Sequence, residues 1–301
     1  MRYTRLVIAT GVGVLLLTGC AEGAGVNDSA GGGGPVVQDV VTEADIVLPV
    51  SAYLFTREQQ ALVDTASSTL AADCMKRFGF DWPVKKTEPL KVVSRRYSVV
   101  GEKVAAEYGY HMIPTAGYDE HAEGAVPSQA KFPPEAYMIY GGKGGDGAAG
   151  RSYQGKDVPE GGCLGEAARK LGLDKVQDPR KGKTGLLSID FSSFGKALAT
   201  PEFKKAQDEW VACMNKSGYQ HTGFMQPAEK YASQGNSASP EEKVVAKADV
   251  KCKQETKLAT VLLRLETKIQ SDYIEQNAAG FAEIKKDRSA VIKSANEALA
   301  N

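Results

Sequence analysis

Apolar residues recur at every fourth position early in the chain, at Leu62, Ala66, Leu70, Cys74 and Phe78. This spacing places them on one face of an α-helix. Thr56 and Gln59 fit a capping box at the start of that helix, and Gly79 fits a left-handed C-cap after its last turn. The pattern predicts a helix that runs to about Phe78 and buries the face that carries Cys74.

The segment 202–217 carries the same helix signals, with Thr200 at the N-cap and Pro201 at the first helical position. Both predicted helices end in the motif Cys-Met-x-basic-x-Gly-aromatic, which begins at Cys74 in one helix and at Cys213 in the other. These repeated motifs predict a body made of two diverged half-copies. A weaker Cys-x-x-Glu match follows in each half, at 163–166 and 252–255.

The C-terminal segment 239–301 contains no proline after Pro240. Ser239 and Glu242 fit a capping box around that proline, and apolar residues then recur at three- and four-residue steps. A single helix of this length would extend for about 90 Å, so a break at 277–280 is an alternative. We expect a long helix or a helical hairpin that packs on the body, or alternatively an arm that projects toward a cell-wall or envelope protein partner.

The stretch between the two cysteines of the first half is expected to be irregular, because prolines and glycines interrupt it. Its sequence predicts only a short helix at 99–108, a short strand at 136–140 and a glycine-rich loop at 143–155. The fold is therefore predicted to be mainly α. A helical body occupies 36–238, with an irregular insert at about 80–160, and the C-terminal segment follows it.

The chain begins with a leader. Arg2 and Arg5 precede an apolar run that is too short to span a bilayer and stops at small residues. Its end, Leu17-Thr18-Gly19-Cys20, resembles the lipobox of bacterial lipoproteins. The resemblance implies that residues 1–19 are a cleaved signal peptide. It also implies that the Cys20 thiol carries a diacylglyceryl group, with acyl chains such as palmitate.

Residues 20–35 are rich in glycine and small polar residues, which cannot hold a packed conformation. They predict a flexible tether with a root-mean-square span of about 20 Å. The expected location is the cell membrane, where the lipid anchor would hold the body outside the cytoplasm. The membrane, through the diacylglyceryl group, is thus the first expected partner.

Four cysteines remain once Cys20 is set aside, and an even number outside the cytoplasm predicts two disulfides. Their wide spacing, with no Cys-x-x-Cys pair, argues against a zinc site. Four cysteines allow three connectivities. The order of the half-copies favours Cys74–Cys163 and Cys213–Cys252.

The charge of the chain is balanced, with 37 Lys and Arg against 37 Asp and Glu. Without Arg2 and Arg5 the mature chain has 35 bases against 37 acids, a net charge of −2. Nucleic-acid binding requires a basic surplus on one face. The sequence therefore predicts no nucleic-acid partner, and it indicates no cofactor.

Several short catalytic motifs occur, but each departs from the pattern that its chemistry requires. Ser-x-x-Lys at 193–196, Lys-Thr-Gly at 183–185 and Ser-x-Asn at 294–296 stand in the wrong order for a penicillin-binding enzyme. The glycines of 142–147 are not followed by an amphipathic helix that could bind a pyrophosphate. We interpret these matches as chance, and we predict no catalytic residue.

The metal-ligating residue types are also poorly arranged. His111, His121 and His221 are too far apart in the sequence to form a pair on one helix. The acidic segment 119–123 has no evident scaffold, and a cation site needs preorganised ligands. We therefore predict no metal site.

Other short motifs run through the mature chain, namely Leu48-Pro49 with Tyr53, Arg96-Tyr97, Tyr108-Gly109-Tyr110-His111, Gly161-Gly162-Cys163, Trp210-x-x-Cys213-Met214 and Cys252. Together they resemble a group of exported actinobacterial lipoproteins of unassigned function. The resemblance covers most of the mature chain and supports the anchor and the disulfides. It implies no activity, ligand or catalytic residue.

The sequence thus predicts a membrane-anchored extracytoplasmic lipoprotein that acts without catalysis, as a binding, scaffold or interaction protein of the cell envelope. A solute-binding lipoprotein of a transporter is one alternative, although such proteins usually alternate strands and helices. An envelope hydrolase is another. It would require clustered carboxylates or a Ser/His pair that the fold brings together.

Overall fold

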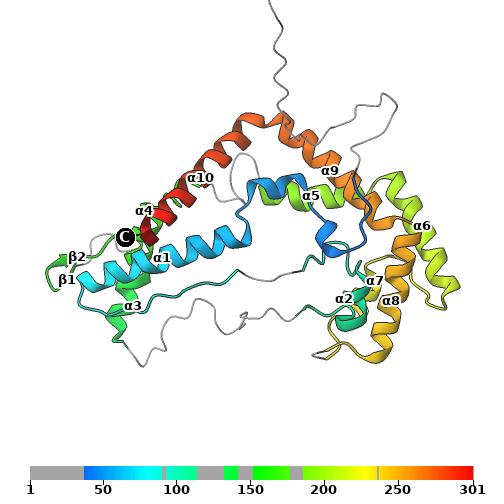
Figure 1. Cartoon of the computed structure of the whole chain (residues 1–301), viewed down its shortest axis with the longest axis horizontal. Helices are drawn as coiled ribbons and strands as arrows, with labels where there is room; N and C mark the ends of the chain where they lie inside the picture. The colour runs from blue at the N-terminus through cyan, green and yellow to red at the C-terminus, as the bar shows by residue number, and fades with distance from the viewer. Residues whose placement is uncertain are drawn as a thin grey trace, which may run out of the picture. The chain divides into compact units, whose positions relative to one another are not determined.

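The computed structural model describes residues 37–89, 93–113, 132–141, 152–176, 186–235 and 237–300, which all belong to one unit of the chain. Cys20, the leader and the tether lie outside these residues. The prediction of a mainly α fold is confirmed, since the only sheet among the described residues is a two-stranded hairpin (Figure 1). The elements are, in chain order, the 3₁₀-helices η1 (Glu43–Asp45) and η2 (Pro49–Tyr53), then α1 (Arg57–Arg77), α2 (Glu102–Tyr108), α3 (Pro134–Gly141), β1 (Ser152–Tyr153), β2 (Lys156–Asp157), α4 (Gly162–Leu171), α5 (Leu186–Leu198), α6 (Pro201–Lys216), α7 (Gln226–Tyr231), α8 (Pro240–Glu255), α9 (Leu258–Gln276) and α10 (Ala278–Ala300).

Helix α1 begins and ends where the sequence predicts. The Thr56 hydroxyl accepts a hydrogen bond from the Gln59 backbone N–H at 3.2 Å, and the Gln59 side-chain oxygen accepts one from the Thr56 N–H at 3.0 Å. This reciprocal pair satisfies two donors that a helix start otherwise leaves unpaired. Ala66, Cys74 and Phe78 of the predicted apolar face are buried, and this face packs toward α4 and α10.

Helices α1 and α6 end in the same backbone motif. Gly79 and Gly218 both adopt the left-handed conformation, with φ of +85° and +87°. The N–H of the following aromatic residue returns to the carbonyl of the motif's methionine, at 3.1 Å after α1 and at 2.9 Å after α6. This is a Schellman motif, in which glycine is favoured because it lacks a Cβ. The repeated sequence motif therefore specifies the same helix end twice.

The two copies of the weaker Cys-x-x-Glu match do not share a structure. Cys163 is the second residue of α4, whereas Cys252 lies in the last turn of α8. Each of these cysteines nevertheless reaches the cysteine of a Cys-Met helix. The structure contains the disulfides Cys74–Cys163 and Cys213–Cys252, with Cα–Cα distances of 5.5 and 5.6 Å. This is the connectivity that the half-copy order favours, and the half-copy interpretation itself stays a prediction.

The prediction of a strand at 136–140 is wrong, because these residues lie within α3. Pro134 begins that helix, where the missing N–H of proline is tolerated. Ala136 and Ile139 are three residues apart and both buried. Apolar residues at this spacing cover the inner face of a helix, so a short apolar run did not distinguish helix from strand.

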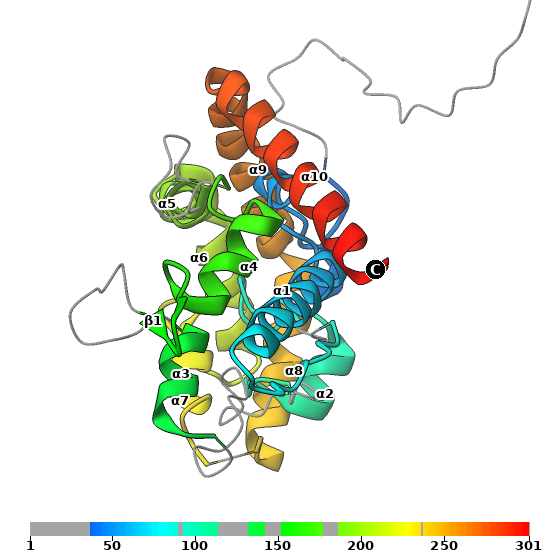
Figure 2. The same ribbon diagram turned by 90° about the vertical axis from the view of Figure 1, so that its left-hand side faces the viewer.

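The C-terminal segment forms three helices rather than one. The expected break is present, with Asn277 between α9 and α10, and the two helix axes diverge from it (Figure 1). A second break, which the sequence analysis did not predict, lies at Lys257 between α8 and α9, where φ is +56°. Helix α10 packs along α1 and α4, and α9 packs along α5 and α6 (Figure 2). The segment therefore packs on the body.

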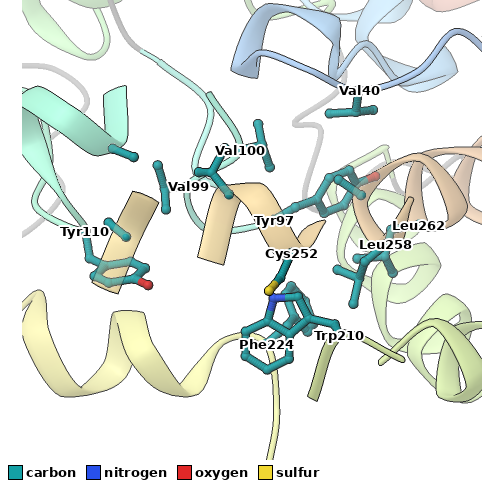
Figure 3. Packing of buried hydrophobic residues seen from close by; sticks show 14 of the residues in the cluster. Val40, Tyr97, Val99, Val100, Tyr110, Trp210, Phe224, Cys252, Leu258 and Leu262 are labelled. Carbon is teal, nitrogen blue, oxygen red and sulfur yellow. The ribbon is translucent and has the colours of Figure 1, made fainter. Parts of the chain in front are cut away.

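Two apolar clusters make up most of the core. The larger one surrounds Trp210 and Tyr97 and is built from α6, α8, α9 and the non-helical segment 97–100 (Figure 3). The second lies between α1, α3 and α4 and contains the Cys74–Cys163 disulfide and Trp82. The larger cluster contains Cys252. Each disulfide thus lies at one of the two main clusters.

Candidate functional site

Several ionisable and nucleophilic side chains that could take part in chemistry lie in the interior. The first group of them is centred on Glu266 of α9, which is completely buried. Its carboxylate accepts hydrogen bonds from Arg96 Nε at 2.9 Å, from the Tyr97 hydroxyl at 2.8 Å and from the Ser193 hydroxyl at 2.8 Å. Arg96 Nη2 also donates to it. Because a carboxylate offers about four lone-pair sites, these donors occupy the group, and it has no capacity left to act as a general base.

Asp190 and Gln270 complete this group, which we call the Glu266 cluster. Arg96 Nη1 donates to Asp190 at 3.0 Å, and Gln270 Nε2 donates to Ser193 Oγ at 2.9 Å. Burial alone would lower the pKa of Arg96, but Glu266 and Asp190 outweigh it and raise that pKa above its ordinary value. The cluster connects α5, α9 and the segment that contains Arg96, so its first role is to hold these elements together.

A second buried pair lies one turn apart on α8, at Asp249 and Lys253. Asp249 accepts hydrogen bonds from Lys253 Nζ and Trp210 Nε1, both at 2.9 Å, and from the Tyr110 hydroxyl at 3.1 Å. Lys253 Nζ also donates to two backbone carbonyls of the segment 97–99, at 3.1 and 2.9 Å. Burial raises the pKa of Asp249 and lowers that of Lys253, while their mutual contact opposes both shifts. The pair fastens the segment 97–99 to α8.

His111 makes a third buried contact, beside the first turn of α8. Its Nδ1 lies 2.9 Å from Glu242 Oε1, and its Nε2 lies 3.4 Å from the carbonyl oxygen of Gly235. Both neighbours are acceptors, so the doubly protonated ring satisfies both of them. The hydrogen bond with the Glu242 carboxylate raises the pKa of His111, and burial opposes this shift only partly.

We expect His111→Gln to lower the free energy of unfolding by about 1–2 kcal/mol at pH 5 and by less at pH 9. Because the folded-state pKa of His111 is raised, protonation contributes its full stabilisation below the unfolded-state pKa of about 6.5. That contribution is lost as the pH rises through the folded-state pKa. Denaturant unfolding of both proteins from pH 5 to pH 9 measures the difference.

The control for this prediction is His221→Gln. His221 forms no hydrogen bond or ion pair within the described residues, and its ring lies 6.2 Å from that of Trp210. The stability difference between wild type and this variant should change much less with pH. A His111→Gln difference that is the same at pH 5 and pH 9 would contradict the assignment of a charged His111–Glu242 contact.

The structure separates the members of the sequence motifs. Ser193 is fully buried and donates to Glu266, whereas Lys196 is exposed on the surface of α5, so the Ser-x-x-Lys motif forms no nucleophile–base pair. Asn296 donates to the backbone of its own helix, at the carbonyl of Ile292. The segments 119–123, 142–147 and 183–185, with His121, lie outside the described residues.

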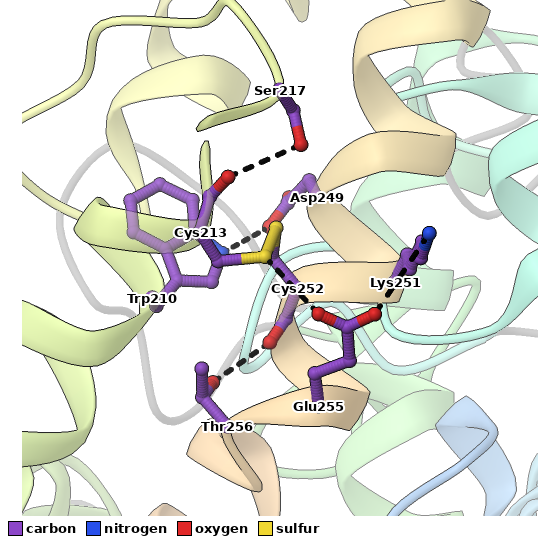
Figure 4. The surroundings of a disulfide bond; sticks show 8 residues. All are labelled: Trp210, Cys213, Ser217, Asp249, Lys251, Cys252, Glu255 and Thr256. Atoms are coloured by element: carbon purple, nitrogen blue, oxygen red, sulfur yellow. Dashed lines mark hydrogen bonds and ion pairs between the residues drawn. A yellow bond between two sulfur atoms is a disulfide. The ribbon is translucent and has the colours of Figure 1, made fainter. Parts of the chain in front are cut away.

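Among the four cysteines that the structure describes, Cys213 is the most accessible. Cys74, Cys163 and Cys252 are buried, but Cys213 is half-buried and lines a surface hollow of about 560 Å³ between α6 and α8. Glu255 Oε2 lies 3.5 Å from Cys213 Sγ, and Lys251 lies 3.9 Å from the same carboxylate (Figure 4). This hollow therefore presents charges of both signs around a disulfide.

Two further hollows open at the surface. One, of about 290 Å³, lies around the edge-to-face pair Phe203 and Phe224, and its lining is mostly apolar and neutral. The other, of about 350 Å³, lies between η2, the start of α1, and α10. Its lining includes Lys285 and Arg288 and no acidic residue. We call it the α10 hollow. Among these three hollows, it is the only one whose charged lining residues are all basic, since Glu229 is the one charged residue in the lining of the hollow around Phe203.

The residues that organise these sites were not predicted from the sequence, although the sequence contains a signal for them. Asp249 stands among Val245, Ala246 and Val250 on the buried face of α8, and Glu266 follows Leu262 by four residues on the buried face of α9. A charged residue at an apolar position of a helix predicts a buried polar contact. Lys285 and Arg288 have no acidic residue three or four positions away, which predicts cations without a partner on their own helix.

Within the described residues, no three His, Cys, Asp or Glu side chains are placed to hold a metal ion, and no helix has the length and apolar character needed to cross a membrane. The interior groups are thus engaged in contacts that hold elements together, and the surface hollows are the remaining candidates for ligand binding. No family model matches the chain, and neither a curated protein nor a solved structure is similar to it.

Proposed function

We propose that this protein is a lipid-anchored, extracytoplasmic binding protein of the bacterial cell envelope, which acts without catalysis. The observation that carries the proposal is the pairing of Cys74 with Cys163 and of Cys213 with Cys252. Disulfides form and persist in oxidising compartments outside the cytoplasm. Their pairing accounts for every cysteine except Cys20, which stands where the lipobox resemblance places the lipid.

A binding role is supported by how the reactive side chains are used. Glu266, Asp249 and Glu242 each accept two or more hydrogen bonds, and Ser193 donates to one of these carboxylates. A general base needs a free acceptor within reach of a substrate proton, whereas these groups are committed to structural contacts. Two acyl chains on Cys20, at about 0.8 kcal/mol for each buried CH₂, would hold such a protein stably at the membrane.

The anchor is tested by growing expressing cells with an alkyne analogue of palmitate. Wild type is expected to incorporate the label, and its mature N-terminus is expected to begin at Cys20 in intact-mass measurements. Cys20→Ala should take up none, because the acceptor thiol is gone. The double variant Cys213→Ser/Cys252→Ser is the matched control, since it removes two cysteines but keeps Cys20, and it should remain labelled. Labelled Cys20→Ala protein would contradict the proposed anchor.

The binding role is tested by crosslinking the anchored protein in intact cells and identifying what it contacts. An adduct with an envelope component is expected for wild type, and the same component should be recovered with crosslinkers of different chemistry. A lipid-anchored protein of known partner serves as the positive control in the same cells. Recovery of that control adduct, with none for this protein, would contradict the proposed role.

A further inference from the structure

We propose that the α10 hollow is a binding site for the phosphate group of a small organic phosphate. It measures about 350 Å³ and is lined by Ala52, Gln59, Lys285, Arg288, Ser289 and Ile292. This volume lies within the range of small-molecule sites, which combine apolar walls with a few convergent polar groups. The inference rests on the proposed binding role but is independent of the lipid anchor.

The charge of the hollow is positive and uncompensated. Lys285 and Arg288 form no ion pair within the described part of the chain. Other lysines of the C-terminal helices do find partners, since Lys268 pairs with Asp272 at 2.8 Å and Lys293 lies 3.8 Å from a glutamate four residues on. Two cations without an acid match the charge of about −1.5 to −2 that a phosphate monoester carries at neutral pH.

Arg288 is held in place by neutral groups. Its Nη1 donates to the carbonyl oxygen of Ala52 at 3.1 Å, its Nη2 donates to Gln59 Oε1 at 3.0 Å, and its guanidinium lies 4.9 Å from the ring centroid of Phe55. Its Nε is buried and has no hydrogen-bond partner. Burial lowers the pKa of Arg288, with no carboxylate opposing the shift. A bound anion would therefore offset the burial of this guanidinium.

Lys285 and Gln59 supply the other donors. The Lys285 ammonium lies 4.8 Å from the ring centroid of Tyr53, and an aromatic face attracts a cation without neutralising it. The Gln59 side-chain oxygen already accepts from the Thr56 N–H and from Arg288, which fixes the orientation of the amide and leaves its NH₂ group available. Three donor groups that are already oriented lose little freedom when they bind an anion.

The organic part of the ligand would contact the apolar members of the lining. Ala52 and Ile292 lie on opposite elements, η2 and α10. A phosphate attached to a short carbon chain thus fits the hollow better than an inorganic ion does. Glycerol 3-phosphate is a free phosphate monoester of this kind. The headgroup of a short-chain phosphatidylglycerol also presents a phosphate next to a short carbon chain, but as a diester with a single negative charge, and it represents a membrane lipid.

The test is isothermal titration calorimetry of the full-length protein in neutral detergent, with glycerol 3-phosphate and with dihexanoylphosphatidylglycerol as separate ligands. Saturable binding of at least one of them to wild type is expected. Lys285→Gln should weaken that binding about tenfold or more, whereas Lys286→Gln should change it less than twofold. Both variants remove one exposed positive charge from α10, and only Lys285 lines the hollow. Arg288 is not the test position, because its contacts with Ala52 and Gln59 also hold α10.

The outcomes separate the two sources of phosphate. Tighter binding of glycerol 3-phosphate assigns the hollow to a free phosphate ester, and tighter binding of the lipid assigns it to a headgroup. Absence of saturable binding of either ligand would overturn the proposal. Equal weakening by both variants would also overturn it, because that result indicates general charge attraction. Thermal unfolding checks that both variants are folded, and a failed palmitate label would leave this site unaffected.

Discussion

Replacement of Glu266 by alanine is expected to lower the free energy of unfolding by about 3–5 kcal/mol. The carboxylate accepts from Arg96, Tyr97 and Ser193 in the interior. Its removal leaves the Tyr97 hydroxyl and part of the guanidinium buried without an acceptor, and the Ser193 hydroxyl keeps only the carbonyl oxygen of Asp190. The desolvation of the groups without an acceptor is then uncompensated. Denaturant unfolding, followed by circular dichroism at 222 nm, measures the loss.

The matched control is Glu275→Ala, which makes the same change on the same helix at an exposed position. We expect it to alter stability by no more than about 0.5 kcal/mol. Glu266→Gln keeps the shape of the side chain and allows both hydroxyls to reorient, so its cost should lie between the two. A Glu266→Ala variant as stable as Glu275→Ala would show that the Glu266 cluster does not hold the fold together.

The second large effect is expected at Asp249, where alanine should also cost about 3–5 kcal/mol. Lys253 would then keep only the two backbone carbonyls of the segment 97–99 as partners, and Trp210 and Tyr110 would each lose an acceptor. A buried ammonium without its carboxylate is strongly disfavoured, so Lys253 should lose its proton at a lower pH. The same unfolding measurement, made at pH 7, gives the cost.

A double-mutant cycle isolates the contribution of the pair. Lys253→Met removes the charge and keeps most of the side-chain volume, so Asp249→Ala/Lys253→Met should cost at least about 1 kcal/mol less than the sum of the single variants. Asp272→Ala is the control, because its contact with Lys268 has the same spacing and a length of 2.8 Å but is exposed. It should cost less than about 1 kcal/mol. Strict additivity at the buried pair would contradict the assigned ion pair.

Local signals in the sequence predicted the helix ends well. The capping boxes at Thr56 and Ser239 and the Cys-Met-x-basic-x-Gly-aromatic motif act over a few residues, so their outcome depends little on the rest of the fold. The two disulfides have the connectivity that the order of the half-copies favoured. The lipid on Cys20 stays a prediction.

Features that depend on distant parts of the chain were not predicted. Helix α5 has no strong start signal in the sequence, and its position depends on contacts of Ser193 and Asp190 with residues more than seventy positions away. The break at Lys257 places a non-glycine residue at positive φ, which no local propensity favours. The same limit applies to the α10 hollow, because η2 and α10 are separated by more than two hundred residues.

The two disulfides also determine what a single cut in the backbone does to this protein. Cys74–Cys163 closes a loop of 89 residues, and Cys213–Cys252 closes one of 39. A protease that cuts once within either loop cannot separate the products, because the bridge still joins them covalently. The nicked protein would keep its mass on a non-reducing gel and divide into two fragments only after reduction. For a protein that works outside the cytoplasm, as we propose, a stretch of irregular chain can thus be cut without releasing the helices on either side.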